Sequence, residues 1–155
     1  MSFLNPRRLW ALTPALALSL AAAPAAWAAE VLAVTASSTD GMLMDAVDGD
    51  LATFWQNKGR GERDAWLAVR FEAPTPIQGV RLKTGALPQG VSFTVETSID
   101  GTTYQPQLQR QRLRDDQAAE LRFDRPAEAL YVRVRFHYEG GGQPPRFKVY
   151  ELEAL

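Results

Sequence analysis

The residues with the most distinctive chemistry lie in one short segment, residues 45–55, with the sequence DAVDGDLATFW. Asp48, Asp50 and Thr53 offer hard oxygen ligands, and Gly49 lets the backbone turn sharply, so that carbonyl oxygens can point inward with them. This set suits calcium. The spacing differs from an EF-hand loop, because the bidentate Glu at its twelfth position is missing. An ordinary Asp-Gly turn explains the same residues.

Composition excludes most other chemistry. The 155 residues include no cysteine and one histidine, His137, so a disulfide framework, a thiolate zinc site and a multi-histidine metal site are impossible. Seventeen basic and eighteen acidic residues leave a net charge of −1, which disfavours an electrostatic nucleic-acid binder. The length fits a single domain.

The first 28 residues have the three parts of a secretory signal peptide. Arg7 and Arg8 precede an apolar, alanine-rich run over residues 9–26, and Ala28 closes a small-x-small cleavage site. A membrane anchor is the alternative, but two prolines interrupt the run, which barely reaches the length of a spanning helix. The sequence therefore predicts cleavage and export, to the periplasm or the medium, with no membrane span in the mature protein.

The rest of the chain alternates apolar and polar residues with the period of half-buried strands. The runs with this period are residues 65–71, 80–83, 91–96, 121–123 and 130–138. Proline and glycine turns separate them, as expected for a sandwich or barrel. We predict one all-β domain over residues 30–155.

Seven short motifs, in order, resemble those of the discoidin or coagulation factor 5/8 type C family. They are ASS at 36–38, AVDGD with Thr53 and Trp55, WLAVRF at 66–71, GVRL at 79–82, VETSIDG at 95–101, LYVRV at 130–134 and VYEL at 149–152. This family overlaps the family 32 carbohydrate-binding modules. The resemblance implies a galactose-binding-like jelly-roll β-sandwich from about residue 33 to the end of the chain.

The resemblance also implies a structural calcium ion, held by the turn before Trp55 and by the last strand. The ligands it implies are the carbonyls of Asp45, Asp50, Thr53 and Tyr150, the Thr53 hydroxyl, and the carboxylates of Asp48 and Glu151. This count matches the six to eight oxygens that calcium prefers. The alternatives are a sodium ion at this point and an empty loop whose polar groups are satisfied by hydrogen bonds.

A ligand site is implied at the end loops, with departures from the family pattern. Asp40 matches the family acid, Gln56 replaces a histidine, Gly59 replaces the stacking aromatic, and Lys83 or the loop after it replaces an arginine and an asparagine. The basic loop at residues 57–63, which contains Lys58 and Arg60, could meet an acidic polysaccharide or a polar lipid head group. A solvated loop is the alternative.

These residues predict an exported, noncatalytic module that binds a glycan or polysaccharide. The alternative is a protein-interaction or adhesion domain that uses the same end loops. An enzyme is disfavoured, because no acidic pair comes with a cleft or a group that would raise one pKa. Trp55 and Trp66 are expected in the core. Arg133 and His137 are expected to be structural.

Overall fold

The computed structural model describes residues 30–59, 61–113 and 118–155. The predicted signal peptide and Arg60 therefore lie outside the described residues. The elements are β1 (Val31–Ala36), the 3-10 helix η1 (Leu43–Ala46), β2 (Trp55–Gln56), β3 (Trp66–Thr84), β4 (Val91–Ser98), β5 (Gln105–Gln111), β6 (Ala119–Tyr138) and β7 (Lys148–Ala154). All strand pairings are antiparallel. The predicted all-β fold is confirmed.

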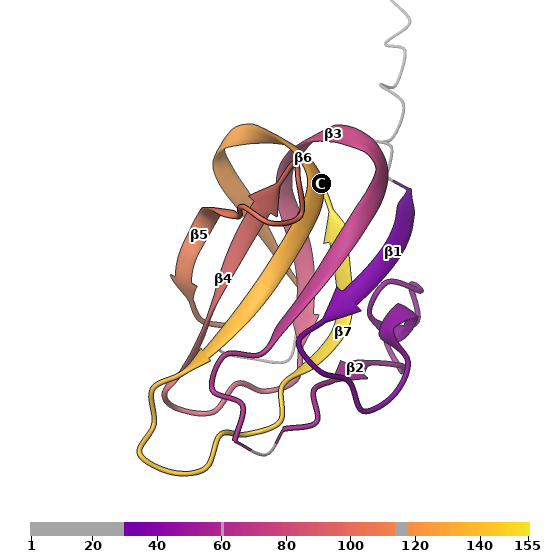
Figure 1. Cartoon of the computed structure of the whole chain (residues 1–155). Helices are drawn as coiled ribbons and strands as arrows, with labels where there is room; N and C mark the ends of the chain where they lie inside the picture. Colours follow the sequence, from indigo (N-terminus) through magenta and orange to yellow (C-terminus); the bar gives the residue numbers. More distant parts are fainter. Residues whose placement is uncertain (1–29, 60, 114–117) are drawn as a thin grey trace, which may run out of the picture.

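Two long strands, β3 and β6, build both layers of the sandwich. Their first pairing joins residues 66–70 to 131–135, and β1, β4 and β5 extend this layer. Their second pairing joins residues 79–82 to 119–122, and β7 and β2 extend that layer. Figure 1 shows both strands arching over one end of the molecule as they pass between the layers. The separate alternating runs of the sequence are thus parts of these continuous, bent strands.

Strands β3 and β6 approach each other closely at Gly79. The register of β3 against β6 shifts between Ile77 and Gly79. A Cβ atom on Gly79 would collide with the carbonyl oxygen of Leu121 and would lie 3.0 Å from Cα of Arg122. Because both contacts are with backbone atoms, only glycine lets the two strands approach this closely.

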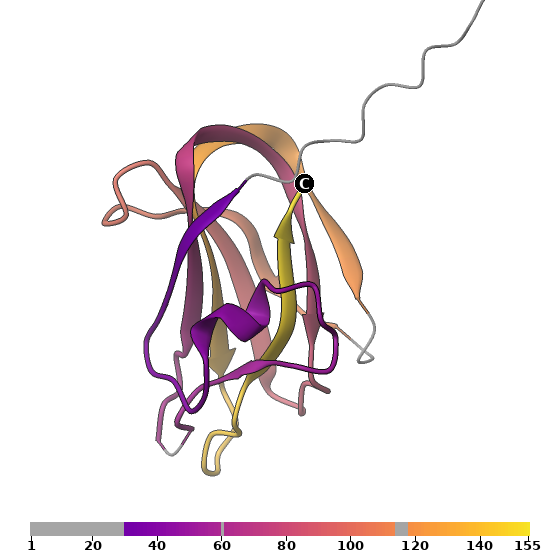
Figure 2. The same cartoon turned by 90° about the vertical axis from the view of Figure 1, so that its right-hand side faces the viewer.

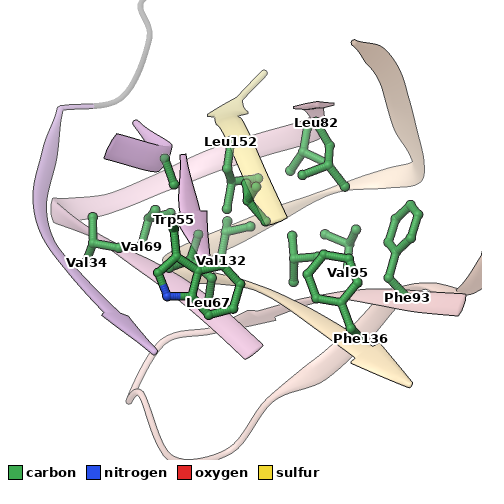
Figure 3. Packing of buried hydrophobic residues seen from close by; sticks show 14 of the residues in the cluster. Val34, Trp55, Leu67, Val69, Leu82, Phe93, Val95, Val132, Phe136 and Leu152 are labelled. Atoms are coloured by element: carbon green, nitrogen blue, oxygen red, sulfur yellow. The ribbon is translucent and has the colours of Figure 1, made fainter. Parts of the chain in front are cut away.

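The core lies between the layers and is filled by the inward residues of each strand. The largest fully buried side chains include Trp55, Phe71, Phe93, Phe136 and Phe147. Figure 3 shows side chains of both layers meeting in this space. Phe136 and Phe147 stack with ring centroids 5.0 Å apart. Because the domain has no cysteine and therefore no disulfide, burial of this apolar surface is its main source of stability.

Trp66 is not a core residue, contrary to the prediction. Leu67 is fully buried, so the alternation of β3 turns Trp66 to the outer face. There the indole ring lies 5.8 Å from the Arg133 guanidinium. Trp55 is buried as predicted, and its indole N–H donates to the Ser38 carbonyl at 3.1 Å.

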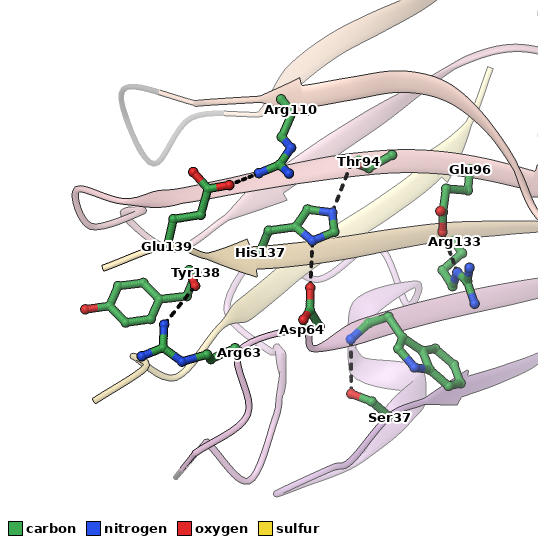
Figure 4. Close-up of polar contacts among 11 residues, drawn as sticks. Ser37, Arg63, Asp64, Thr94, Glu96, Arg110, Arg133, His137, Tyr138 and Glu139 are labelled. Atoms are coloured by element: carbon green, nitrogen blue, oxygen red, sulfur yellow. Dashed lines mark hydrogen bonds and ion pairs between the residues drawn. The ribbon is translucent and has the colours of Figure 1, made fainter. Parts of the chain in front are cut away.

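The outer face of the β3, β6 and β4 layer carries a polar network, shown in Figure 4. Arg133 Nε lies 2.6 Å from Glu96 Oε2, and both side chains are nearly buried. His137 lies between Asp64, at 2.7 Å from Nδ1, and Thr94, at 3.1 Å from Nε2. Arg133 and His137 are therefore structural, as predicted. Within the described residues, no helix has the length and hydrophobicity to cross a membrane.

Candidate functional site

The loop after η1 is held in a tight turn by its own acidic side chains. Gly49 has a φ of +77°, a conformation that glycine adopts without strain. The N–H of Asp50 donates to Asp48 Oδ1 at 2.9 Å, and the N–H of Ala52 donates to Asp50 Oδ1 at 2.9 Å. The Asp50 side chain is thus engaged within the turn, and its carbonyl faces Thr53.

The Thr53 hydroxyl lies at the centre of a group of oxygen atoms. Thr53 Oγ1 is 2.9 and 3.1 Å from the two carboxylate oxygens of Asp48, 2.9 Å from the Asp50 carbonyl and 3.4 Å from the Asp45 carbonyl. A hydroxyl has one proton, so it can satisfy one of these four acceptors. Asp48 Oδ1 also accepts from the Asp50 N–H, and the Asp50 carbonyl accepts from the Thr53 N–H at 3.2 Å, but the four oxygens remain crowded around one hydroxyl, an arrangement that a cation would stabilise.

Glu151 reaches this loop from the far end of the chain. The N–H of Gly49 donates to Glu151 Oε2 at 3.0 Å. Burial raises the pKa of the Glu151 carboxyl above its usual value, the hydrogen bond from Gly49 lowers it, and the charges of Asp48 and Glu153 raise it. The carboxylates of Asp48 and Glu151 are therefore close enough to repel each other.

A β-bulge in β7 allows Glu151 to turn toward the loop. Lys83 pairs with Glu151 and Thr84 pairs with Val149, so Tyr150 is an extra residue against β3. Such a bulge re-aims the side chains next to it. The Tyr150 ring packs against Phe54 at 5.2 Å. No hydrogen bond among the described residues joins the Tyr150 carbonyl to the loop.

The structure thus brings together five of the six residues predicted to bind the cation, through the carbonyls of Asp45 and Asp50, the Thr53 hydroxyl and the carboxylates of Asp48 and Glu151. Within residues 30–59, 61–113 and 118–155, no group of three or more His, Asp or Glu side chains could hold a metal. The candidate cation site therefore consists of two carboxylates, backbone carbonyls and one hydroxyl.

The predicted ligand residues Asp40, Gln56 and Lys58 gather at the end of the sandwich opposite the β3 and β6 arch. The N–H of Asp40 donates to the Gln56 carbonyl at 2.8 Å, and the N–H of Lys58 donates to Ser38 Oγ at 3.1 Å. The Gln56 side chain is nearly buried, whereas Lys58 is exposed. Glu62 accepts hydrogen bonds from Ser38 and Asn57, which fixes the base of the basic loop.

Lys83 lies apart from these three residues, on the outer face of the layer formed by β2, β7 and β3. Its ammonium group is 5.3 Å from the Tyr150 ring centroid. On the same face, the Lys148 ammonium group is 4.2 Å from the Phe54 ring centroid. Two lysines thus cover a pair of aromatic rings next to the end of the sandwich opposite the arch, which we call the loop end.

A cavity of about 250 Å³ lies beside these rings, lined by Gly85, Ala86, Leu87, Arg146, Lys148 and Tyr150. Arg146 pairs with Asp40 at 2.9 Å. Sequence reasoning missed Arg146 and Lys148, although both lie just before the VYEL motif at residues 149–152. They are the cations of this cavity.

Gly59 explains the missing aromatic ring. It has a φ of +80°, and a Cβ atom there would collide with Cγ of Arg146. The stem of Arg146 therefore lies against Gly59, the position at which the family resemblance implies a stacking aromatic.

Several solved carbohydrate-binding modules have a similar fold. A pectin-binding module matches with a TM-score of 0.65 and 20% sequence identity, and the match covers 81% of this chain and 91% of that module. Chitosan-binding module 1 of a chitosanase/glucanase from Paenibacillus sp. IK-5 matches with a TM-score of 0.67 and 25% sequence identity. This match covers 79% of this chain and 93% of that module. The family 32 module of NanJ from C. perfringens, solved with galactose, has a TM-score of 0.62 and 16% identity, covering 79% and 91%.

The family model of the F5/8 type C domain matches residues 33–147 of this chain. The chain therefore belongs to the F5/8 type C domain family, and its fold is the galactose-binding-like β-sandwich that the sequence motifs implied. The comparison with curated proteins finds no match.

Proposed function

We propose that this chain is an exported, noncatalytic module that binds a glycan at its loop end. The observation that carries this proposal is the cavity lined by Arg146 and Lys148, whose Arg146 pairs with the predicted ligand residue Asp40. Polar side chains around a shallow cavity suit the hydroxyl groups of a sugar. The similar modules named above support the same class of ligand.

The charge of the loop end favours a glycan that carries carboxylate groups. The ion pairs of the described residues engage Arg146 but neither Lys83 nor Lys148. The similar modules bind pectin, chitosan and galactose, so the fold does not select the charge of the sugar. In this chain the positive charges of Arg146 and Lys148, which line the cavity, favour an anionic sugar. An acidic polysaccharide such as polygalacturonate fits these charges.

We also propose that the loop at Asp48 holds a structural calcium ion. The ligand set of carboxylates, carbonyls and one hydroxyl contains only hard oxygens, which favour calcium over zinc. The crowding of acceptors around Thr53 supports a cation at this point. The ion would join the loop after η1 to β7 and would hold the adjacent Phe54 beside the glycan site.

A noncatalytic role agrees with the lining of the cavity. None of the described residues that line it carries a carboxylate, and Asp40 nearby pairs with Arg146. Glycoside hydrolysis requires two carboxyl groups on either side of the scissile bond. We expect no hydrolysis of a panel of aryl glycosides.

Calorimetric titration with galacturonate oligomers, galactose and chitosan oligomers tests the glycan proposal. We expect binding of the galacturonate oligomers and an affinity that falls as salt is added, because ionic contacts are screened. Lys148→Ala should weaken binding about tenfold or more, as expected for loss of a charge-assisted hydrogen bond. Arg125→Ala, in the arch at the opposite end, is the matched control and should bind normally.

Binding of galactose alone, with no effect of salt, would contradict the anionic ligand but keep a glycan site. Binding of none of the three sugars by a folded protein, together with no signal on a broad glycan array, would contradict the glycan proposal itself. Export is tested separately, by N-terminal sequencing of the secreted product, which should begin near Ala29.

A further inference from the structure

Two lysines beside the cavity carry charges that no acid among the described residues neutralises. Lys83 lies near the end of β3, and Lys148 is the first residue of β7. Both are partly exposed, and neither takes part in an ion pair within the described part of the chain. Figure 2 shows β7, in yellow, running down into the loops, with the purple segment that contains β2 beside it. The two lysines therefore add unpaired positive charge to the layer that borders the cavity.

The acid opposite Lys83 in the sheet is engaged elsewhere. Lys83 is paired in register with Glu151, and residues opposite each other in a ladder share a face of the sheet. The Glu151 carboxylate accepts the Gly49 N–H at 3.0 Å and belongs to the candidate cation site. The positive charge of Lys83 is therefore available to an external anion.

Aromatic rings hold both ammonium groups in place. The Lys83 ammonium group lies 5.3 Å from the Tyr150 ring centroid, and that of Lys148 lies 4.2 Å from the Phe54 ring centroid. The two rings also contact each other, with centroids 5.2 Å apart. A cation over a ring keeps its charge but loses part of its freedom before a ligand arrives. This lowers the cost of ordering the lysine side chains on binding.

The cavity continues into this surface. Lys148 and Tyr150 line the cavity together with Gly85. A Cβ atom on Gly85 would lie 3.5 Å from Cβ of Lys148 and 3.9 Å from Cε2 of Tyr150, so the backbone at Gly85 packs directly against both side chains. Lys83 precedes Gly85 by two residues and is not part of the lining. Its ammonium group lies over the ring of Tyr150, which joins Lys83 to the cavity.

The size of the cavity limits what it can hold. Its volume of about 250 Å³ is below the roughly 300–1,000 Å³ of cavities that hold drug-sized ligands, so it suits one sugar unit. The carboxylate of such a unit would meet Arg146 and Lys148. Because Lys83 lies beyond the lining, a ligand reaches it only through a further unit. A chain with a carboxylate on every unit supplies an anion at both places.

We propose that the glycan site extends from the cavity across Tyr150 to Lys83, so that the module binds a segment of two or more uronic acid units of an acidic polysaccharide. The carboxylate of one unit binds at Lys148, and the carboxylate of a neighbouring unit binds at Lys83. This inference rests on the proposed function, and it adds that the ligand is a chain rather than a single acidic sugar.

Calorimetric titration with galacturonate and its trisaccharide, in calcium and physiological salt throughout, tests the extension. The wild-type protein should bind the trisaccharide about tenfold or more tightly than the monosaccharide, the scale of one charge-assisted hydrogen bond. Three units that compete for a one-unit site raise the affinity by about threefold at most, so the expected gain exceeds this statistical effect. The fully methyl-esterified sugars have the same rings without the charges and should show no gain beyond it.

Variants of the protein locate the gain. Lys83→Gln should remove it and leave the affinity for the monosaccharide unchanged, whereas Lys83→Arg keeps the charge and should keep most of the gain. Lys148→Ala, inside the cavity, should weaken both sugars by about the same factor. Arg125→Gln, in the arch at the opposite end, also removes a cation and is the matched control that should change neither affinity.

A gain of threefold or less in the wild type, a full gain in Lys83→Gln, or a full gain with the methyl esters would overturn the extension. In each of these cases the monosaccharide still binds, so the proposed glycan site stands. If the monosaccharide binds too weakly to measure, loss of trisaccharide binding in Lys83→Gln but not in Lys83→Arg supports the extension, and equal binding by all three proteins overturns it. If neither sugar binds the folded protein, the anionic ligand is contradicted and the extension fails with it.

Discussion

The N–H of Gly49 donates to Oε2 of Glu151 at 3.0 Å, across 102 positions of sequence. This contact joins the loop after β1 to the last strand, and it directs the Glu151 carboxylate at the oxygens around Thr53. In a fold without disulfides, a cation at this point would constrain both ends of the domain. The first two predictions follow from this geometry.

Added calcium should raise the melting temperature of the protein, and a chelator should lower it. The unfolded chain has no preformed site, so binding stabilises the native state by about 2.7 kcal/mol when calcium is a hundredfold above its dissociation constant. Differential scanning calorimetry with and without chelator measures the effect. Equal melting temperatures under both conditions, and no metal in the purified protein, would show that the turn holds no ion.

Asp48→Asn and Glu151→Gln should each abolish the calcium response. Glu153→Gln is the matched control, because Glu153 lies on the same strand but pairs with Arg81 at 2.6 Å. This control should lower the melting temperature slightly through loss of the ion pair and keep the full calcium response. A lost response in Glu153→Gln would assign the ion to a different set of ligands.

The metal-free protein should lose stability as pH rises above the usual pKa of a glutamate. Burial raises the pKa of Glu151, so the native state binds more protons than the unfolded state between the unfolded and folded pKa values. The free energy of unfolding therefore falls with rising pH across that window. Glu151→Gln mimics the protonated carboxyl, so in chelator it should flatten this part of the curve.

Urea unfolding from pH 4 to pH 8 tests this sign. In chelator at pH 7, Glu151→Gln should be at least as stable as the wild type, and in millimolar calcium it should be less stable. This reversal separates a cation ligand from a carboxylate that merely accepts a hydrogen bond. If Glu151→Gln is the less stable protein under both conditions, the carboxylate is favourable without an ion.

Local patterns made much of this structure predictable. The alternation of apolar residues identified the inward side chains Leu67, Val134 and Phe136, because the period of a strand fixes which side is buried. The turn at Asp48 and its partner Glu151 came from motifs whose order and chemistry are specific. The alternation depends on short stretches of chain, whereas the pairing of the turn with Glu151 rested on the family resemblance.

Long-range features were not predictable from the same patterns. The runs at residues 65–71 and 80–83 read as two strands, but β3 continues through a bend that contains Pro74 and Pro76, residues that usually interrupt a strand. Trp66 turned outward because its neighbour Leu67 occupies the core. The position of Arg146 over Gly59, beside the candidate ligand site, depends on how two distant loops meet.

Loss of Arg133 should destabilise the fold strongly, because its partner is nearly buried. The side chains of Arg133 and Glu96 are 13% and 11% exposed, and Arg133 also stacks on Tyr104 at 3.6 Å. Arg133→Met keeps much of this packing but leaves an unpaired carboxylate, at a cost of about 3 kcal/mol. Adding Glu96→Gln should recover much of this loss.

Arg110→Met is the control for this prediction. Arg110 pairs with Glu139, and both side chains are 60% exposed. Loss of such a pair should change the free energy of unfolding by less than about 1 kcal/mol. Denaturant titration of the three variants gives the comparison, and equal effects of Arg133→Met and Arg110→Met would mean that solvent screens both pairs alike.

The sign of the effect of Asp40→Asn should reveal the charge of the glycan. Asp40 holds Arg146 in an ion pair at 2.9 Å, so its carboxylate competes with an anionic sugar for the guanidinium. Removing that charge should tighten binding of galacturonate oligomers about two- to fivefold, the scale of an exposed ion pair. For a neutral sugar, Asp40 would instead accept hydrogen bonds from hydroxyl groups, and the same change should weaken binding by about 1–3 kcal/mol. Calorimetry with both classes of sugar decides between these cases, and Asp124→Asn in the arch at the other end of the sandwich is the control that should change neither affinity.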